Sequence, residues 1–187
     1  MTIWSAGPLA GHKPMITLLT GNINKISQEI YNSFISGLQI YRLTCPSCGL
    51  SGGFTVHGYY NRSIRTEDGM EKLRILRLKC RCGKTHAVLL SSMIPWSQLS
   101  LSDTVLILKS GHNSENYIFL QLSIPDISIS LIRSIRIRFH RFFEQRLLSE
   151  KIPLSPGDGL VKSCFRFFSR QFMQIRWGPN ILYEAST

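Results

Sequence analysis

The sequence of 187 residues has no apolar run close to the roughly 20 residues that a membrane-spanning helix requires. Its first 20 residues carry Lys13 in their middle and show no cationic start followed by an apolar stretch, which argues against a signal peptide. We therefore expect a soluble protein of the reducing cytoplasm, where thiols stay reduced, with no membrane partner. The sequence also has no internal repeat and no low-complexity stretch.

Acidic residues are scarce, because 11 Asp and Glu stand against 22 Lys and Arg, giving a formal net charge of +11. This excess favours a polyanionic partner, although charge alone does not separate DNA, RNA and an anionic membrane surface. The shortage also argues against a two-metal nuclease, which needs carboxylates on separate strands. Asp103, Asp126 and Asp158 fall at predicted helix starts or in a linker, where capping or solvation is the ordinary role.

Other catalytic patterns are missing too. The sequence contains no Gly-rich phosphate loop and no plausible Ser-His-Asp set. We therefore predict that the protein is not an enzyme.

Cysteine is limited to five residues, and four of them form two tight pairs. The pairs are Cys45-Pro46-Ser47-Cys48 and Cys80-Arg81-Cys82. Zinc takes four such ligands in a tetrahedron, and two short loops across a hairpin can supply them. Gly49 and Gly83 follow the pairs, as expected of zinc knuckles, although the second pair is one residue shorter than the commonest spacing. The pattern predicts one structural Zn²⁺, held by Cys45, Cys48, Cys80 and Cys82, with a closed shell that leaves no catalytic position.

Two histidines and the fifth cysteine have alternative roles. His57 and His86 could replace a cysteine as ligands, since His86 lies shortly after Cys82, but an ordinary strand or loop histidine is the favoured interpretation of both. Cys164 falls on the apolar side of a predicted helix, which favours a buried, inert thiol.

The region around the cysteines predicts a small β module. Phe54 to Tyr60 and Lys72 to Lys79 are β-prone runs joined by a polar turn at Asn61 to Gly69, and Thr85 to Leu90 is a third run. Before them, the apolar spacing from Asn22 to Leu38 predicts a packing helix, with Asn22 or Asn24 as its cap.

The predicted ribbon is strongly basic, and Ile75, Arg77 and Lys79 share one face of its second strand, which predicts a basic side. Between residues 42 and 86 nine basic residues stand against three acids. A solvated strand face is the ordinary explanation, yet the excess beside a metal site makes phosphate contact about equally plausible. The candidate DNA contacts of the ribbon are Arg62, Arg65, Arg74, Arg77, Lys79 and Arg81.

Residues 101–148 predict three helices, at Ser102 to Ser110, Ser114 to Leu122 and Ser128 to Leu148, in an arrangement typical of a helix-turn-helix. On a helical wheel the third has an apolar arc that contains Leu131, Ile132, Ile135 and Phe139. Its remaining surface holds the candidate DNA contacts Ser130, Arg133, Ser134, Arg136 and Arg141. Near the start of such a helix, Ser130, Arg133 and Ser134 would face base edges in a major groove.

Two alternatives remain for this third segment. Ser134 to His140 also alternates like a strand, and an arginine-rich amphipathic helix can lie on a membrane or be plain solvated surface.

These elements predict an α+β fold, a small zinc-ribbon β module followed by a helix-turn-helix-like helical region. The expected organisation is an N-terminal helical segment (1–40), the zinc ribbon (41–98), the helix-turn-helix-like region (99–150), and a linker with a C-terminal amphipathic helix (151–187).

The order of these parts resembles a known family. Cys45-Pro46-Ser47-Cys48, His57-Gly58-Tyr59-Tyr60 and Arg77-Leu78-Lys79-Cys80-Arg81-Cys82-Gly83, followed by Pro95 and a helical region, are similar to an uncharacterised family of short bacterial proteins, a domain of unknown function with a transposase-like zinc ribbon. The resemblance implies that the four cysteines are metal ligands and that the protein is linked to insertion-sequence transposases. It also implies a bacterial, nucleoid-associated location in the cytoplasm.

The leading hypothesis is a zinc-ribbon protein that binds double-stranded DNA as a recognition or accessory component of a mobile-element system. The alternative is a zinc-stabilised module that docks on a transposase or recombinase and binds DNA only weakly. A degenerate metal-dependent nuclease ranks last. The DNA site, the preference for DNA over RNA and the oligomeric state do not follow from the sequence.

Overall fold

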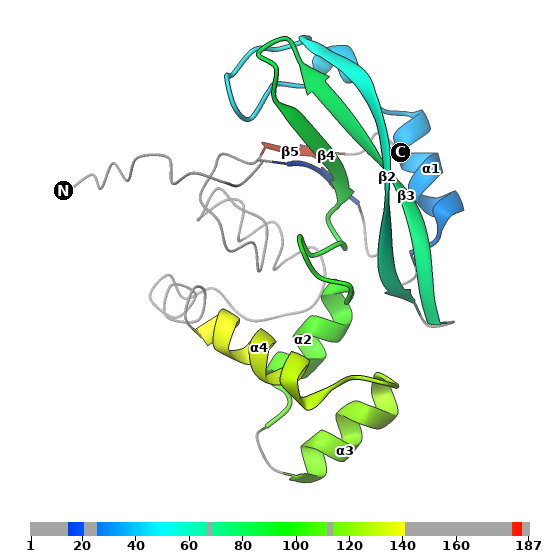
Figure 1. The fold of residues 1–187 in the computed structure, drawn as a ribbon, viewed down its shortest axis with the longest axis vertical. Helices are drawn as coiled ribbons and strands as arrows, with labels where there is room; N and C mark the ends of the chain where they lie inside the picture. Colours follow the sequence, from blue (N-terminus) through cyan, green and yellow to red (C-terminus); the bar gives the residue numbers. More distant parts are fainter. Residues whose placement is uncertain (1–14, 21–25, 67–68, 112–113, 141–180, 185–187) are drawn as a thin grey trace, which may run out of the picture.

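The computed structural model describes residues 15–20, 26–66, 69–111, 114–140 and 181–184. Strands and the first helix form one body, and three further helices lie at its end (Figure 1). The prediction of a mixed α+β fold is thereby confirmed.

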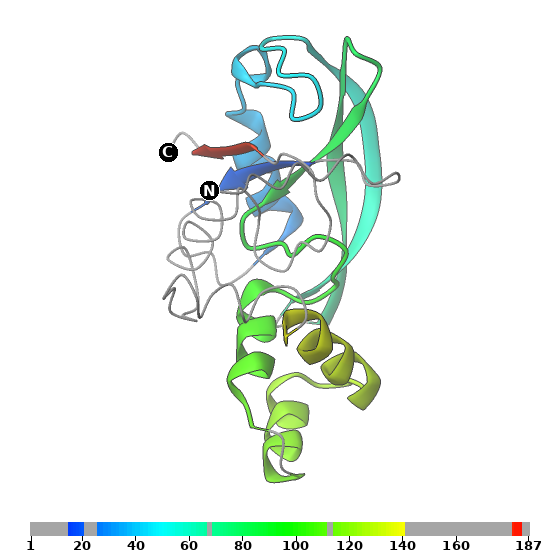
Figure 2. The ribbon, with the colours of Figure 1, turned by 90° about the vertical axis from the view of Figure 1, so that its left-hand side faces the viewer.

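The strands form one sheet in the order β2-β3-β4-β1-β5. Their bounds are β1 Ile16–Leu19, β2 Phe54–Thr66, β3 Gly69–Cys80, β4 Thr85–Leu90 and β5 Ile181–Glu184. The pairs β2–β3 and β3–β4 are antiparallel, whereas β1 lies parallel to both β4 and β5. In both views β1 and β5 cross the direction of the long β2–β3 hairpin, so the sheet is strongly twisted (Figures 1 and 2).

Strand β4 joins the two parts of this sheet by changing partner along its length. Its first residues pair with β3, ending at Arg77 opposite Ala87, and from Val88 onward it pairs with β1. The two edges of β4 are therefore used at different positions. The sequence predicted β4 itself but not β1 or β5, and its prediction for residues 1–40 was a helix alone.

The β2–β3 hairpin is longer than the sequence predicted. The predicted polar turn from Asn61 to Gly69 is largely strand, and the ladder continues to Thr66 opposite Gly69. Arg65 and Thr66 are half-buried and Ile64 is buried, so this end of the hairpin is packed rather than solvated. At about 3.3 Å per residue, the hairpin extends roughly 40 Å. A register shift between Val56 and Gly58 places a bulge at His57.

Helix α1 (Gln28–Ser36) packs on the sheet through Tyr31, which is fully buried. The Tyr31 hydroxyl accepts a hydrogen bond from the Leu76 backbone N–H and donates one to the Val88 carbonyl, both at 2.9 Å. It thereby bridges β3 and β4 just beyond their last paired residues. Ser27 caps the helix, so the expectation of Asn22 or Asn24 as the cap was wrong.

The apolar stripe predicted for α1 is only partly used. Ile30, Phe34 and Leu38 are half-buried, and Ile26 is buried but precedes the helix. The aromatic residue next to the stripe, Tyr31, is the one that the sheet covers completely.

The helical half contains α2 (Leu101–Lys109), α3 (Ser114–Ser123) and α4 (Ile129–Phe139). Ser100 and Asp103 form a capping box at the start of α2, and Ser128 caps α4. A second core of aliphatic side chains lies between these helices and the turn that follows β4. The three predicted helices are thus confirmed within the described residues.

Two features of the sequence analysis lie outside the described residues. They are the continuation of the third helix to Leu148, including Arg141, and the C-terminal amphipathic helix with Cys164. Over the parts of the chain that are described, no helix has the length and apolar character to span a bilayer.

Candidate metal centre and basic surfaces

The four paired cysteines meet at one end of the long hairpin. Their Sγ atoms all lie within 4.8 Å of one another. Cys45 Sγ is 3.9 Å from Cys82 Sγ, and Cys48 Sγ is 3.7 Å from Cys80 Sγ. A tetrahedron with bonds of about 2.3 Å has edges of about 3.8 Å, so these separations are compatible with a four-thiolate zinc site. The predicted grouping of Cys45, Cys48, Cys80 and Cys82 is confirmed.

Tight backbone turns bring the thiols together. The Gly49 N–H donates to the Cys45 carbonyl and the Gly83 N–H donates to the Cys80 carbonyl, at 2.8 and 2.9 Å. Both glycines have positive φ, 75° and 83°, a conformation that costs little without a Cβ. The shorter second pair can still contribute both thiols, because Cys80 is the last residue of β3 and Cys82 lies in the turn that follows.

The site has a buried and an exposed side. Cys45 and Cys80 are 1% and 2% exposed, whereas Cys48 and Cys82 face solvent. Burial raises the pKa of Cys45 to about 12, and the Lys84 backbone N–H lowers the pKa of Cys82 to about 7. A metal that binds all four as thiolates must therefore displace a proton from Cys45, while Cys82 is the thiol most ready to bind.

His86 supports this site. It is fully buried, its ring packs edge-on against Phe54, and its Nε2 lies 3.4 Å from Cys45 Sγ. With the proton on Nε2, the ring donates to the Cys45 sulfur, and such outer contacts orient metal ligands. The sequence signal was its position shortly after Cys82. His57 is exposed at the bulge of β2 and is not part of the thiol group.

The candidate contacts of the ribbon differ in exposure. Lys79, Arg81 and Arg74 are exposed, and the Arg74 guanidinium lies 4.5 Å from the centre of the Tyr59 ring. Arg65 and Arg77 are half-buried. The basic strand face predicted for β3 is interrupted, because Ile75, which alternates with Arg77 and Lys79, is completely buried.

Arg62 has a structural contact that the sequence did not predict. Its Nη2 donates to the carbonyls of Ile94 and Ser97, and burial lowers its pKa from the usual value. This half-buried guanidinium ties β2 to the turn after β4.

Helix α4 presents its two sides as the helical wheel predicted. Ile132, Ile135 and Phe139 are buried against the helical core, and this side of the prediction is confirmed. Ser130, Arg133 and Ser134 are exposed together near the start of the helix. Leu131 differs from the prediction, because it is 39% exposed at the edge of the packed side.

Arg136 faces α2 and binds its C-terminal end. Its Nη2 donates to the Ser110 carbonyl and hydroxyl and to the Gly111 carbonyl, at 3.1, 2.9 and 2.8 Å. Carbonyls at the end of a helix have no partner within the helix, and a cation is favoured there. The contact fixes α4 on α2.

The structure does not gather all candidate contacts on one surface. The end of β3, with Lys79, Cys80 and Arg81, and helix α4 lie at opposite ends of the molecule (Figure 1). The two candidate surfaces are therefore separate.

Comparison with known proteins gives one family match, which covers part of the chain. Residues 45–117 match the family Domain of unknown function (DUF6431). The DUF6431 match begins at the first cysteine, includes all four thiols, β2 to β4 and α2, and ends within α3. It confirms the resemblance to an uncharacterised domain family and assigns no activity. No curated protein and no solved structure matches the chain.

Proposed function

We propose that this protein binds double-stranded DNA through helix α4, with a structural zinc ion in the four-cysteine site. The observation that carries the proposal is the exposed group of Ser130, Arg133 and Ser134 on a helix whose opposite side is packed. Helices that enter a major groove present short polar and basic side chains near their start, as α4 does. The arrangement of α2, α3 and α4 serves as the helix-turn-helix unit of this proposal.

The zinc ion has a structural role in this proposal. Four thiolates close its coordination shell, so it joins the loop before β2 to the β3–β4 turn and offers no position for a substrate. We therefore propose a binding protein rather than an enzyme. The order of the parts, a zinc ribbon followed by a helical region that would bind DNA, is similar to that of transposases. This order further suggests a recognition or accessory role in a mobile-element system.

The length of the hairpin gives a scale for DNA that could contact both basic regions. The hairpin is roughly 40 Å long, and duplex DNA rises about 3.4 Å per base pair. A duplex as long as the hairpin has roughly 12 base pairs, so joint contact by α4, Lys79 and Arg81 is expected only on longer duplexes. Contact by α4 alone would need fewer.

The test uses the zinc-loaded full chain and random duplexes of 8 and 20 base pairs in a salt titration. Affinity should fall steeply with salt, because cations are released from the phosphates on binding. Arg133→Ala should weaken binding, because it removes the exposed cation from the side of α4 that would enter the groove.

Lys109→Ala is the matched control. It removes the same charge from an exposed position in α2, so it changes the net charge without touching α4. Equal weakening by Arg133→Ala and Lys109→Ala would contradict recognition by α4. Unchanged retention of Arg133→Ala on duplex DNA would do the same.

A second function, a protein-docking module, is favoured by the surface of α3. Ile118, Phe119 and Leu122 are 57%, 51% and 79% exposed on this short helix. Apolar side chains that cluster on a surface mark interaction sites. The partner in this case would be a transposase or recombinase. Capture of such a protein, lost on Phe119→Ser and Leu122→Ser but not on Arg133→Ala, together with no shift of duplex DNA, would support it.

A further inference from the structure

The turn after β4 holds a tryptophan in an unfavourable conformation. The Ser97 N–H donates to the Ile94 carbonyl at 3.1 Å, with Pro95 and Trp96 at the two central positions. Trp96 has φ 65°, the region that glycine or asparagine normally occupies in a turn that begins with proline. A bulky residue with this backbone angle is an outlier, and such outliers concentrate at functional sites.

Arg62 holds this turn through two hydrogen bonds. Its guanidinium donates to the carbonyls of both Ile94 and Ser97, the first and last residues of the turn. The indole of Trp96 is nevertheless 59% exposed. The strained backbone and the arginine contact therefore hold a large aromatic ring at the surface instead of burying it.

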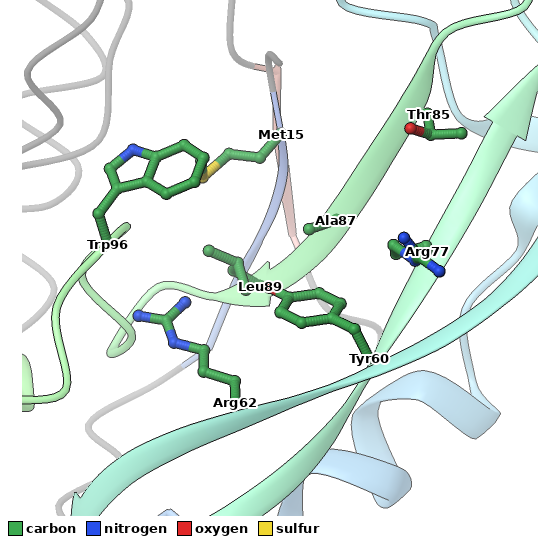
Figure 3. Close-up of a pocket in the computed structure, with 8 residues that line it drawn as sticks. All are labelled: Met15, Tyr60, Arg62, Arg77, Thr85, Ala87, Leu89 and Trp96. Carbon is green, nitrogen blue, oxygen red and sulfur yellow. The ribbon is translucent and has the colours of Figure 1, made fainter. Parts of the chain in front are cut away.

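The indole borders a pocket of about 280 Å³ on the sheet. Ala87 and Leu89 of β4 lie in the middle, with Trp96 and Met15 on one side and Arg77 and Thr85 on the other (Figure 3). Tyr60 and Arg62 of β2 complete the lining, and α1 lies behind the sheet in this view. The volume lies near the lower end of the range for small-molecule sites and excludes a duplex.

The lining favours an anion. Among the described residues that line the pocket, two are arginines and none is acidic. Arg77 lies 6.0 Å from the centre of the Tyr60 ring, and its buried Nε has no hydrogen-bond partner. A buried guanidinium N–H without an acceptor is uncommon, because it loses its hydration without compensation. Because that nitrogen is closed to solvent, a ligand in the pocket would meet the rest of the Arg77 guanidinium, and a phosphate group suits a guanidinium.

We propose that this pocket binds a single nucleotide, with its base against Trp96 and its phosphate at Arg77. A nucleotide carries a flat base and, on its sugar, a phosphate, and these groups suit the exposed face of the indole, the apolar floor and the Arg77 guanidinium in turn. The source is either a free nucleoside monophosphate or an unpaired nucleotide of a single strand. The inference goes beyond duplex binding, because the pocket lies on the sheet and not on α4.

The test measures binding of the full zinc-loaded chain to thymidine 5′-monophosphate, to thymidine, to deoxyribose 5-phosphate and to an eight-residue oligothymidylate. Calorimetry gives the affinities. The monophosphate or the oligonucleotide should bind. Thymidine and the sugar phosphate should each bind at least about tenfold more weakly than whichever of these two binds, because each lacks one of the two recognised groups. Binding of the oligonucleotide alone identifies the strand as the source, and equal binding of the monophosphate identifies the free nucleotide.

Two variants separate binding from folding. Trp96→Gly removes the indole and relieves the positive φ, so it should keep or increase thermal stability while reducing nucleotide affinity at least about tenfold. Arg77→Gln removes the guanidinium at the phosphate and should also reduce nucleotide affinity at least about tenfold. Lys72→Gln removes an exposed charge from the same strand and should leave nucleotide affinity unchanged. Wild-type affinity of Trp96→Gly, or no binding of any probe at millimolar concentration, would overturn the proposal. Duplex binding of the wild-type chain and of Arg133→Ala, measured in parallel, tests the proposed function of α4 independently of the pocket.

Discussion

The hydroxyl of Tyr31 should stabilise the fold strongly for a single atom. β3 and β4 separate after Arg77 and Ala87, and the hydroxyl bridges the gap by accepting from the Leu76 N–H and donating to the Val88 carbonyl. In Tyr31→Phe the buried N–H loses its acceptor, at a cost of about 1 to 3 kcal/mol, and the second hydrogen bond adds about 1 kcal/mol. The free energy of unfolding should therefore fall by roughly 3 kcal/mol.

Urea unfolding measures this change. Zinc is kept saturating for both proteins, because a ligand that binds only the folded state adds to the apparent stability. For a chain of this length the same loss lowers Tm by roughly 6 to 12 °C. Tyr41→Phe is the matched control, since Tyr41 is 67% exposed and its change should stay within about 0.5 kcal/mol. If Tyr31→Phe also stays within that margin, the hydroxyl does not bridge the strands as argued.

Two further predictions concern α4 and the metal centre. Arg136→Ala should lower the free energy of unfolding by about 1 to 3 kcal/mol, because it removes a charged donor from the carbonyls at the end of α2, whereas Arg133→Ala should change it by less than about 0.5 kcal/mol. Equal unfolding midpoints of the two variants in urea would contradict this difference. Zinc affinity, measured by competition with a chelator, should fall as pH decreases from 8 to 6, because the pKa of Cys82 is lowered only to about 7 and that of Cys45 is raised to about 12. A pH-independent affinity would contradict the need to displace thiol protons.

Local patterns were predictable from the sequence. The four cysteines come together as their spacing indicated, because hairpin strands return the chain to its starting point regardless of the strand length. The packed and exposed sides of α4 follow from helical periodicity, and Ser128, a residue type that favours this position, caps the helix. These features depend on residues a few positions apart or on one antiparallel pairing.

Long-range features could not be predicted in this way. Strand β1 pairs with β4 and with β5, which are about 70 and 165 positions away along the chain. Its four buried residues show no alternation, because a strand covered on both faces is apolar or neutral throughout. The hairpin turn was predicted too early for a related reason, since the packing of Ile64 overrides the polar character of its neighbours.

The structure also changes what the net charge of +11 means for DNA binding. The sequence gives every arginine the same charge, but Arg62 and Arg136 bind backbone carbonyls and hold the turn after β4 and the end of α2. These cations compensate unpaired carbonyls, so their removal should affect folding before it affects any ligand. Arg133 has no such contact among the described residues and stands exposed beside two serines. Duplex binding, as proposed, would therefore depend on the exposed Arg133 of α4 rather than on the total charge of the chain.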